Sequence, residues 1–265
     1  MHKLLLIIML AVWPVSVNVH AQETTNFTEM TLEQLQSVDQ TTLSKKERKT
    51  FKKALKKKKK AAAKAVKAAA KAKKKRLKKY NKIYKYTKIT GSDFDKYISV
   101  TGPDPNYMAS GIFGALLSTE SVGWNLRSWV YPSGKSNHQL FVSKNYRDKW
   151  RFYNVAKFRR GGKAEFASIN TEVTGCDGSQ YGQECDKQET FGATIPLSML
   201  LNAFKTGQGI DVQFQAKSGD TLTQEVPAHY IQAYVKKMAD ELNIIPKDIL
   251  AEGTAIIENG SAAGL

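Results

Sequence analysis

The sequence is poor in the residues on which most catalytic sites depend. Of its four histidines, only His138 and His229 lie beyond the first 21 residues, and they are far apart in the chain. Serine elbows of the Gly-x-Ser-x-Gly type, metalloprotease motifs, phosphate loops and dinucleotide-binding motifs are absent. We therefore predict a protein that is not an enzyme, with no catalytic residue, metal site or cofactor, whose two histidines are surface or packing residues. An acidic site formed in space, for instance by Glu165, Glu172 and Glu189, stays open, although single strand glutamates are expected on the solvated face.

Long hydrophobic runs are also absent, except at the N-terminus. Residues 1–21 contain Lys3, an apolar stretch over residues 4–12 and small residues before Gln22, which is the pattern of a cleaved secretory signal peptide. An uncleaved anchor is less favoured, because the stretch is short for a bilayer span of roughly 20 residues and Pro14 interrupts it. We predict an exported protein, periplasmic or secreted.

Cysteine is limited to Cys176 and Cys185, which lie in a polar, glycine-rich stretch. In an exported protein this pair favours a disulfide, worth ~2.7 kcal/mol in the chain-entropy model. A metal site would need four ligands, and the neighbouring Asp177, Glu184 and Asp186 are weak candidates. Free thiols are the remaining alternative.

Acidic residues are almost missing from the segment Lys45–Lys88. It holds 23 Lys and Arg against Glu47 alone, which gives a formal charge of +22. The whole chain carries +17, so the residues outside this segment sum to −5. The basicity is therefore local, and it indicates a polyanionic partner.

The same segment is predicted to be one helix, within a basic region over residues 44–90. Ser44 and Glu47 have capping-box spacing, and Gly and Pro are absent until Gly91. Apolar residues spaced three and four apart from Phe51 to Tyr84 form a seam like that of a coiled coil. Alanine fills the middle of this seam, so it predicts weak self-association at most, beside the alternative of a solvated single helix.

The remainder of the chain shows the alternation of half-buried strands. Residues 210–217 alternate apolar and polar side chains. In a second such strand Trp150, Phe152, Ala156 and Phe158 are expected to face inward, and Arg151, Tyr153 and Lys157 outward. Further strands are predicted at 94–100, 125–131, 139–143, 165–173, 189–195 and 221–226, and helices at 106–118, 197–205 and 228–242.

These patterns predict an α+β fold, in which a long N-terminal Lys/Ala-rich helix precedes a mainly antiparallel β-rich domain with a few helices. The predicted parts are a signal peptide (1–21), a polar linker (22–43), the basic helix (44–90), the α+β domain (91–242) and a mobile tail (243–265). The aromatic residues around Trp150 are expected in the core rather than in a ligand platform. Tyr80 and Tyr84 are expected to dock the helix end onto the β-rich domain, the alternative being contacts to phosphates and bases or to a membrane interface.

Three partial resemblances bear on the origin of the chain. Met30, Leu32, Glu33 and Leu35, followed by residues 41–46, resemble the short leader before the plug of TonB-dependent outer-membrane receptors, but nothing downstream is similar to a plug or barrel. Residues 94–234 resemble uncharacterised exported proteobacterial proteins, on the phrase 146–153, Gly161-Gly162, the two cysteines and Glu189. The lysine and alanine tract is similar in composition only to the spacer helix of TolA-type envelope proteins. Together the resemblances imply a Gram-negative envelope protein.

The expected function is binding, with a structural spacer or adaptor as the alternative. The polyanion would be lipopolysaccharide, anionic lipid or nucleic acid, and the β-rich domain would bind an unknown ligand or an envelope protein. The candidate polyanion-binding residues are Lys52, Lys53, Lys56, Lys57, Lys58, Lys59, Lys60, Lys64, Lys67, Lys71, Lys73, Lys74, Lys75, Arg76, Lys78 and Lys79.

Overall fold

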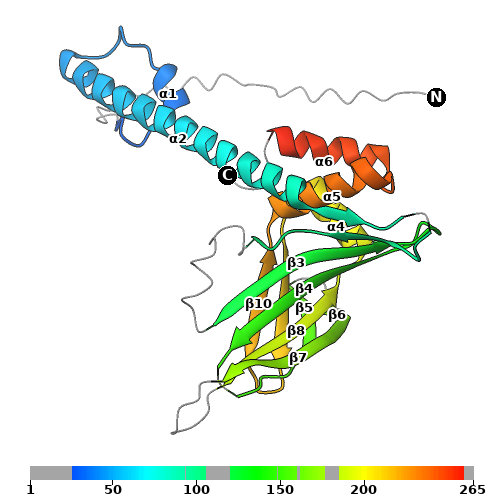
Figure 1. Cartoon of the computed structure of the whole chain (residues 1–265). Helices are drawn as coiled ribbons and strands as arrows, with labels where there is room; N and C mark the ends of the chain where they lie inside the picture. The colour runs from blue at the N-terminus through cyan, green and yellow to red at the C-terminus, as the bar shows by residue number, and fades with distance from the viewer. Residues whose placement is uncertain are drawn as a thin grey trace. The chain divides into compact units, whose positions relative to one another are not determined.

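A computed structural model describes residues 26–92, 94–105, 120–147, 149–159, 162–176 and 185–259. The chain divides into two compact units, residues 1–68 and 69–265, and the division falls inside one long helix (Figure 1). The fold class is α+β, as the sequence predicts. The predicted signal peptide and the predicted helix at 106–118 lie outside the described residues.

Two capping boxes start the helices of the first unit. In α1 (Leu32–Gln36) the Thr31 hydroxyl accepts from the Gln34 amide, and the Gln34 side chain accepts from the Thr31 amide. In α2 (Lys45–Tyr86) the Ser44 amide donates to Oε2 of Glu47 at 2.9 Å, which confirms the predicted helix start. These hydrogen bonds lower the pKa of Glu47.

The first unit has a small hydrophobic core. Phe27 and Leu35 are buried against Phe51 and Ala54 of α2, and the rings of Phe27 and Phe51 meet edge to face with centroids 5.5 Å apart. The interpretation of residues 22–43 as a polar linker is therefore wrong for its described part. The stretch is polar overall, but its few apolar side chains are the ones that meet the helix.

Six strands form the larger, fully antiparallel sheet of the second unit. Their order is β1 (Lys88–Thr90), β2 (Ile98–Thr101), β3 (Ser121–Val130), β4 (Ser136–Tyr146), β8 (Cys185–Thr194) and β7 (Phe166–Cys176). The smaller sheet has the order β10 (Thr221–Val226), β9 (Ile210–Ala216), β5 (Tyr153–Phe158) and β6 (Gly162–Ala164). Side chains from both sheets share one core, where the rings of Phe191 and Phe214 lie 4.9 Å apart.

The strand β5 departs from the predicted alternation at its start. Tyr153 is buried, whereas Phe152 is 49% exposed, the reverse of the prediction. Phe152 has a φ of +54°, and the pairing of β5 with β9 shifts between Tyr153 and Val155. Because of this irregularity, Tyr153 faces the core and Phe152 faces outward.

Three helices pack on the core of the second unit, namely α4 (Leu197–Thr206), α5 (Ala228–Leu242) and α6 (Lys247–Asn259). The predicted mobile tail is therefore wrong for residues 247–259. Gly253 of α6 lies against the ring of Phe204, where a β-carbon would come within 1.9 Å of a ring carbon. Only glycine allows α6 to approach α4 so closely.

The end of α2 belongs to the second unit. Ile83 is buried in the core, Tyr80 and Tyr84 pack beside it, and the Tyr84 hydroxyl donates to Asp240 of α5 at 2.8 Å. This arrangement confirms the predicted docking role of the two tyrosines. It also moves the boundary of the second unit from residue 91 into the helix.

The predicted disulfide between Cys176 and Cys185 is present and joins the ends of β7 and β8. Among the helices of the described ranges, none combines the length and the hydrophobicity needed to cross a bilayer.

Candidate polyanion-binding surface

One face of α2 carries lysine at every position. Because an α-helix has 3.6 residues per turn, residues spaced alternately three and four apart lie along a single face. We call this row of side chains the lysine stripe; its members are Lys46, Lys49, Lys53, Lys57, Lys60, Lys64, Lys67, Lys71, Lys75, Lys78, Lys82 and Lys85, all of them exposed.

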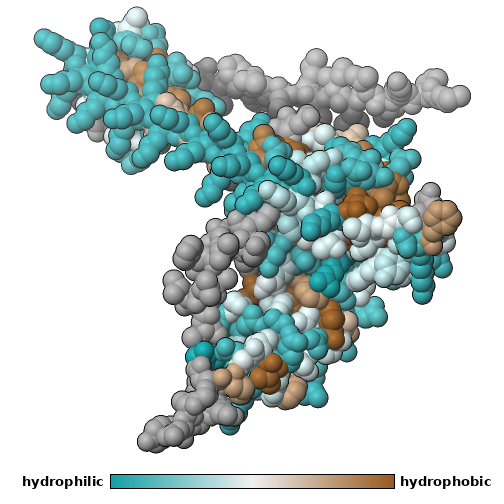
Figure 2. Space-filling model, viewed as in Figure 1, coloured by the Kyte–Doolittle hydropathy of each residue, from teal (hydrophilic) through white to brown (hydrophobic). Residues whose placement is uncertain are grey.

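The opposite face of α2 is used for packing. Phe51 and Ala54 bury their side chains in the first unit, and Tyr80, Ile83 and Tyr84 pack in the second. The apolar seam is therefore occupied by the chain itself at both of its ends, and alanines form most of what remains. In Figure 2, hydrophilic side chains cover most of the visible surface of α2.

The stripe has little compensation by acidic residues. Within the described part of the chain, no lysine from Lys46 to Lys78 takes part in an ion pair, and Glu47 is the one acidic residue of α2. Successive lysines are about 5.3 Å apart along the helix axis, so neighbouring charges repel by about 0.8 kcal/mol in water before salt screening. A row of phosphates or carboxylates would relieve this repulsion.

The stripe separates the predicted lysines into two groups. Eight of the sixteen belong to it, whereas Lys58, Lys73 and Arg76 lie on the packing side of the helix. Arg76 donates to the carbonyl oxygen of Ile257 at 3.2 Å and so has a structural contact. The sequence prediction was based on the spacing of apolar residues, and it missed four stripe members, Lys46, Lys49, Lys82 and Lys85. Counting lysines at the same three- and four-residue spacing would have identified them.

The middle of α2 packs against neither core. Every residue from Ala63 to Lys75 is exposed, including Val66 at 70%. Helix propensity, which is highest for alanine and high for lysine, must hold this part without tertiary contacts. The stripe is consequently open along its central turns.

The buried carboxylate of Glu189 holds the start of strand β5 in the second unit. Oε1 of Glu189 accepts from the amides of Arg151 (3.0 Å) and Phe152 (2.8 Å) and from the Tyr146 hydroxyl, and Oε2 accepts from the amide of Tyr153 (2.9 Å). Burial and the hydrogen bond to Glu189 raise the pKa of Tyr146, which keeps its hydroxyl protonated as a donor. All contacts of this carboxylate are made to the fold, and the expectation of a solvated strand glutamate is wrong here.

The three strand glutamates do not form an acidic pair. Glu172 and Glu165 are exposed, and the register places Thr171, not Glu172, opposite Glu189. Among the described residues, no group of three or more His, Cys, Asp and Glu side chains is placed to hold a metal ion.

Both histidines lie against the packed interior rather than in an open site. Nδ1 of His138 lies 2.7 Å from the Ser128 hydroxyl, which lies 2.7 Å from the Tyr234 hydroxyl, and all three residues are buried. Burial lowers the pKa of His138 to about 4. Burial, followed by the charges of Lys79 and Arg76, lowers the pKa of His229 to about 4 as well.

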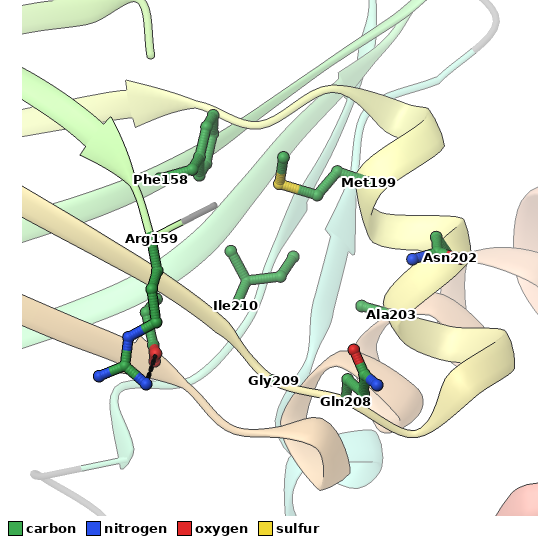
Figure 3. Close-up of a pocket in the computed structure, with 9 residues that line it drawn as sticks. Phe158, Arg159, Met199, Asn202, Ala203, Gln208, Gly209 and Ile210 are labelled. Atoms are coloured by element: carbon green, nitrogen blue, oxygen red, sulfur yellow. Dashed lines mark ion pairs between the residues drawn. The ribbon is translucent and has the colours of Figure 1, made fainter. Parts of the chain in front are cut away.

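A cavity of about 370 Å³ opens between β5, β9 and α4 (Figure 3). Phe158, Met199 and Ile210 provide apolar walls, and Arg159 and Asp211 form an ion pair at 3.0 Å on the rim. The paired charges cancel, and the described lining contains no nucleophile beside a base. The cavity offers space for a small molecule beside apolar walls and one ion pair.

Comparison with known proteins leaves the family open. The chain matches no protein-family model, and no curated protein shows significant sequence similarity to it. Inference about function therefore rests on the residues and their geometry.

Proposed function

We propose that the protein binds polyanions through the lysine stripe of α2 as an exported, non-enzymatic envelope protein. The observation that carries the proposal is the unbroken row of exposed lysines on the face opposite the packing seam. The predicted signal peptide and the disulfide support export to an oxidising compartment. The candidate partners there are lipopolysaccharide phosphates, anionic lipid headgroups and extracellular DNA.

The binding mode follows from the geometry of the stripe. From Lys46 to Lys85 the helix rises about 58 Å, and one face of it can lie along a linear polyanion or a charged surface. Each lysine that neutralises a phosphate releases counterions, which makes affinity fall steeply with salt. Lysine ammonium groups contact phosphates without reading base edges, so binding is expected to be independent of nucleotide sequence.

The test compares two sets of lysines with equal charge. The test uses the chain from Gln22 onward, the start expected after signal-peptide cleavage. The probes are a duplex DNA of about 17 base pairs, which matches the stripe in length, and vesicles containing phosphatidylglycerol. Glutamine replaces lysine because it keeps helix propensity. One variant changes four stripe lysines, and its control changes four lysines on other faces; the sets are Lys57, Lys60, Lys64 and Lys67, and Lys52, Lys59, Lys73 and Lys79.

The stripe variant is expected to lose up to four contacts, which would lower the slope of log affinity against log salt on DNA by about 3.6. The control variant is expected to lose about one contact or fewer. Equal losses in the two variants would contradict an oriented stripe. Absence of binding to both probes by the unchanged protein would contradict the proposal as a whole.

A second candidate is a spacer or adaptor, favoured by the exposed stretch from Ala63 to Lys75 between two packed ends. A spacer requires helix length but not positive charge. The spacer role predicts that the Lys→Gln variants keep the protein's function in the cell, whereas deletion of whole helical turns from α2 abolishes that function.

A further inference from the structure

The cavity between β5, β9 and α4 has an apolar interior. Ala203 and Ile210, which line it, are buried, and Phe158 and Met199 are half-buried beside them (Figure 3). Its volume of about 370 Å³ lies near the lower end of the range for small-molecule pockets, which is roughly 300–1,000 Å³. The cavity is therefore matched in size to a compact ligand with an apolar part.

Charges of opposite sign meet at the mouth of this cavity. Arg159, the residue after β5, and Asp211 of β9 form the ion pair at 3.0 Å. The strand register places Glu225 of β10 opposite Asp211, and it places Lys157 of β5 opposite Gln213 of β9. Positive charge therefore lies on the β5 side of the mouth, and negative charge lies on the β9 and β10 side.

The ion pair leaves capacity for a ligand. A guanidinium has five N–H donors, and among the described residues the Arg159 side chain, which is 72% exposed, pairs with Asp211 alone. Glu225 is in no ion pair with the described residues. Its Oε1 lies 3.7 Å from where a β-carbon on Gly209 would be, and Gly209 lines the cavity. A ligand with both charges could therefore pair with the two carboxylates and the guanidinium while the ion pair stays intact.

We propose that this cavity binds a free α-amino acid with an apolar side chain. The ligand carboxylate accepts hydrogen bonds from the Arg159 guanidinium, and the ligand ammonium group donates to the carboxylates of Asp211 and Glu225. The apolar side chain of the ligand lies against Phe158 and Met199, away from water. Both charged groups of an α-amino acid are attached to one carbon, so they lie close together, as the paired groups of Arg159 and Asp211 do.

The arrangement of charge selects a zwitterion over other small molecules. A ligand that is only an anion would face the Asp211 and Glu225 carboxylates, and one that is only a cation would face Arg159 and Lys157. A neutral apolar ligand would remove water from the ion pair without replacing the lost hydrogen bonds. A peptide carries its ammonium and carboxylate groups at opposite ends, so it cannot present both at this mouth.

Calorimetry tests the ligand class directly. The chain from Gln22 onward is titrated with L-leucine, L-methionine and L-phenylalanine, and at least one of them is expected to bind with a Kd below about 1 mM. Two analogues of each amino acid lack one charge; for leucine they are isoamylamine, without the carboxylate, and isocaproate, without the ammonium group. Each analogue is expected to bind at least about tenfold more weakly than its parent amino acid.

Two variants test the residues that hold the charges. Arg159→Gln and Asp211→Asn are each expected to weaken binding about tenfold or more. Lys135→Gln and Glu172→Gln are the controls, because they remove the same charges from exposed positions outside the cavity lining, and both should bind normally. The ligand analogues are measured on the unchanged protein, so a variant that unfolds cannot hide a failure.

This site shares no residue with the lysine stripe, and the stripe variant with four glutamines should bind the amino acid equally well. No binding of the three amino acids at about 5 mM would overturn the proposal. Equal binding of an amino acid and either of its analogues would also overturn it, as would unchanged affinity in either Arg159→Gln or Asp211→Asn.

Discussion

Replacement of Glu189 by glutamine should destabilise the β-rich unit strongly. The carboxylate accepts four hydrogen bonds, three of them from consecutive backbone amides at Arg151, Phe152 and Tyr153. Glutamine keeps one oxygen facing the first three donors, but it places an NH₂ group against the amide of Tyr153. That amide then has no acceptor, and the other three bonds lose the assistance of the negative charge.

The magnitude follows from these contacts. A buried donor left without an acceptor costs about 1–3 kcal/mol, and hydrogen bonds to charged groups contribute more than neutral ones. Glu189→Gln is therefore expected to lower the free energy of unfolding by about 3 kcal/mol. For a unit of about 200 residues this corresponds to a fall of about 6–12 °C in Tm.

Thermal unfolding followed by circular dichroism measures this change. Glu172→Gln is the matched control, since Glu172 is exposed in the neighbouring strand β7, and it should stay within about 0.5 kcal/mol of the unchanged protein. A Tm for Glu189→Gln within about 2 °C of the unchanged protein would show that the carboxylate does not hold the start of β5.

Three further predictions concern the packing. Ile83→Ala should destabilise the second unit by about 2–4 kcal/mol in urea unfolding, because Ile83 is buried. Val66→Ala, in the exposed middle of the helix, should have little effect. Similar changes in the free energy of unfolding for both variants would argue against docking of α2. Phe51→Ala should remove most hydrogen-exchange protection at residues 32–36, since it empties the core of the first unit. His138 keeps its neutral form when folded, with a pKa of about 4 against 6.5, so stability should fall by up to about 3 kcal/mol as pH drops from 6.5 to 4. A His138→Gln variant should lack this part of the pH dependence in urea titrations, and an unchanged slope would contradict it.

Much of the fold follows from local patterns. The residue ranges of β10 and α5 agree with the prediction, and α4 extends one residue beyond it, because prolines mark the helix starts and strict alternation marks β9 and β10. The capping box at Ser44 likewise places the start of α2. In these elements the local signal and the tertiary structure agree.

The missed features depend on contacts distant in sequence. From the sequence, Leu35 looks like an isolated surface residue, and only the folded chain places Phe51 of α2 beside it. Pro246 precedes α6 as Pro196 and Pro227 precede α4 and α5, but the packing of α6, where Gly253 fits closely against Phe204, depends on a contact distant in sequence. The buried position of Glu189 depends on the backbone before Tyr153, where Phe152 has a positive φ and three consecutive amides donate to the carboxylate. The lysine stripe, in contrast, was predictable from helical spacing.

The most direct test of the central claim is the salt dependence of binding to duplex DNA by the protein from Gln22. Engagement of about six to ten stripe lysines predicts that affinity falls by roughly 10³ to 10⁵ between 50 mM and 200 mM salt, whatever the DNA sequence. An affinity that does not change over this range, or no detectable binding at about 50 mM salt, would contradict the polyanion-binding role of α2.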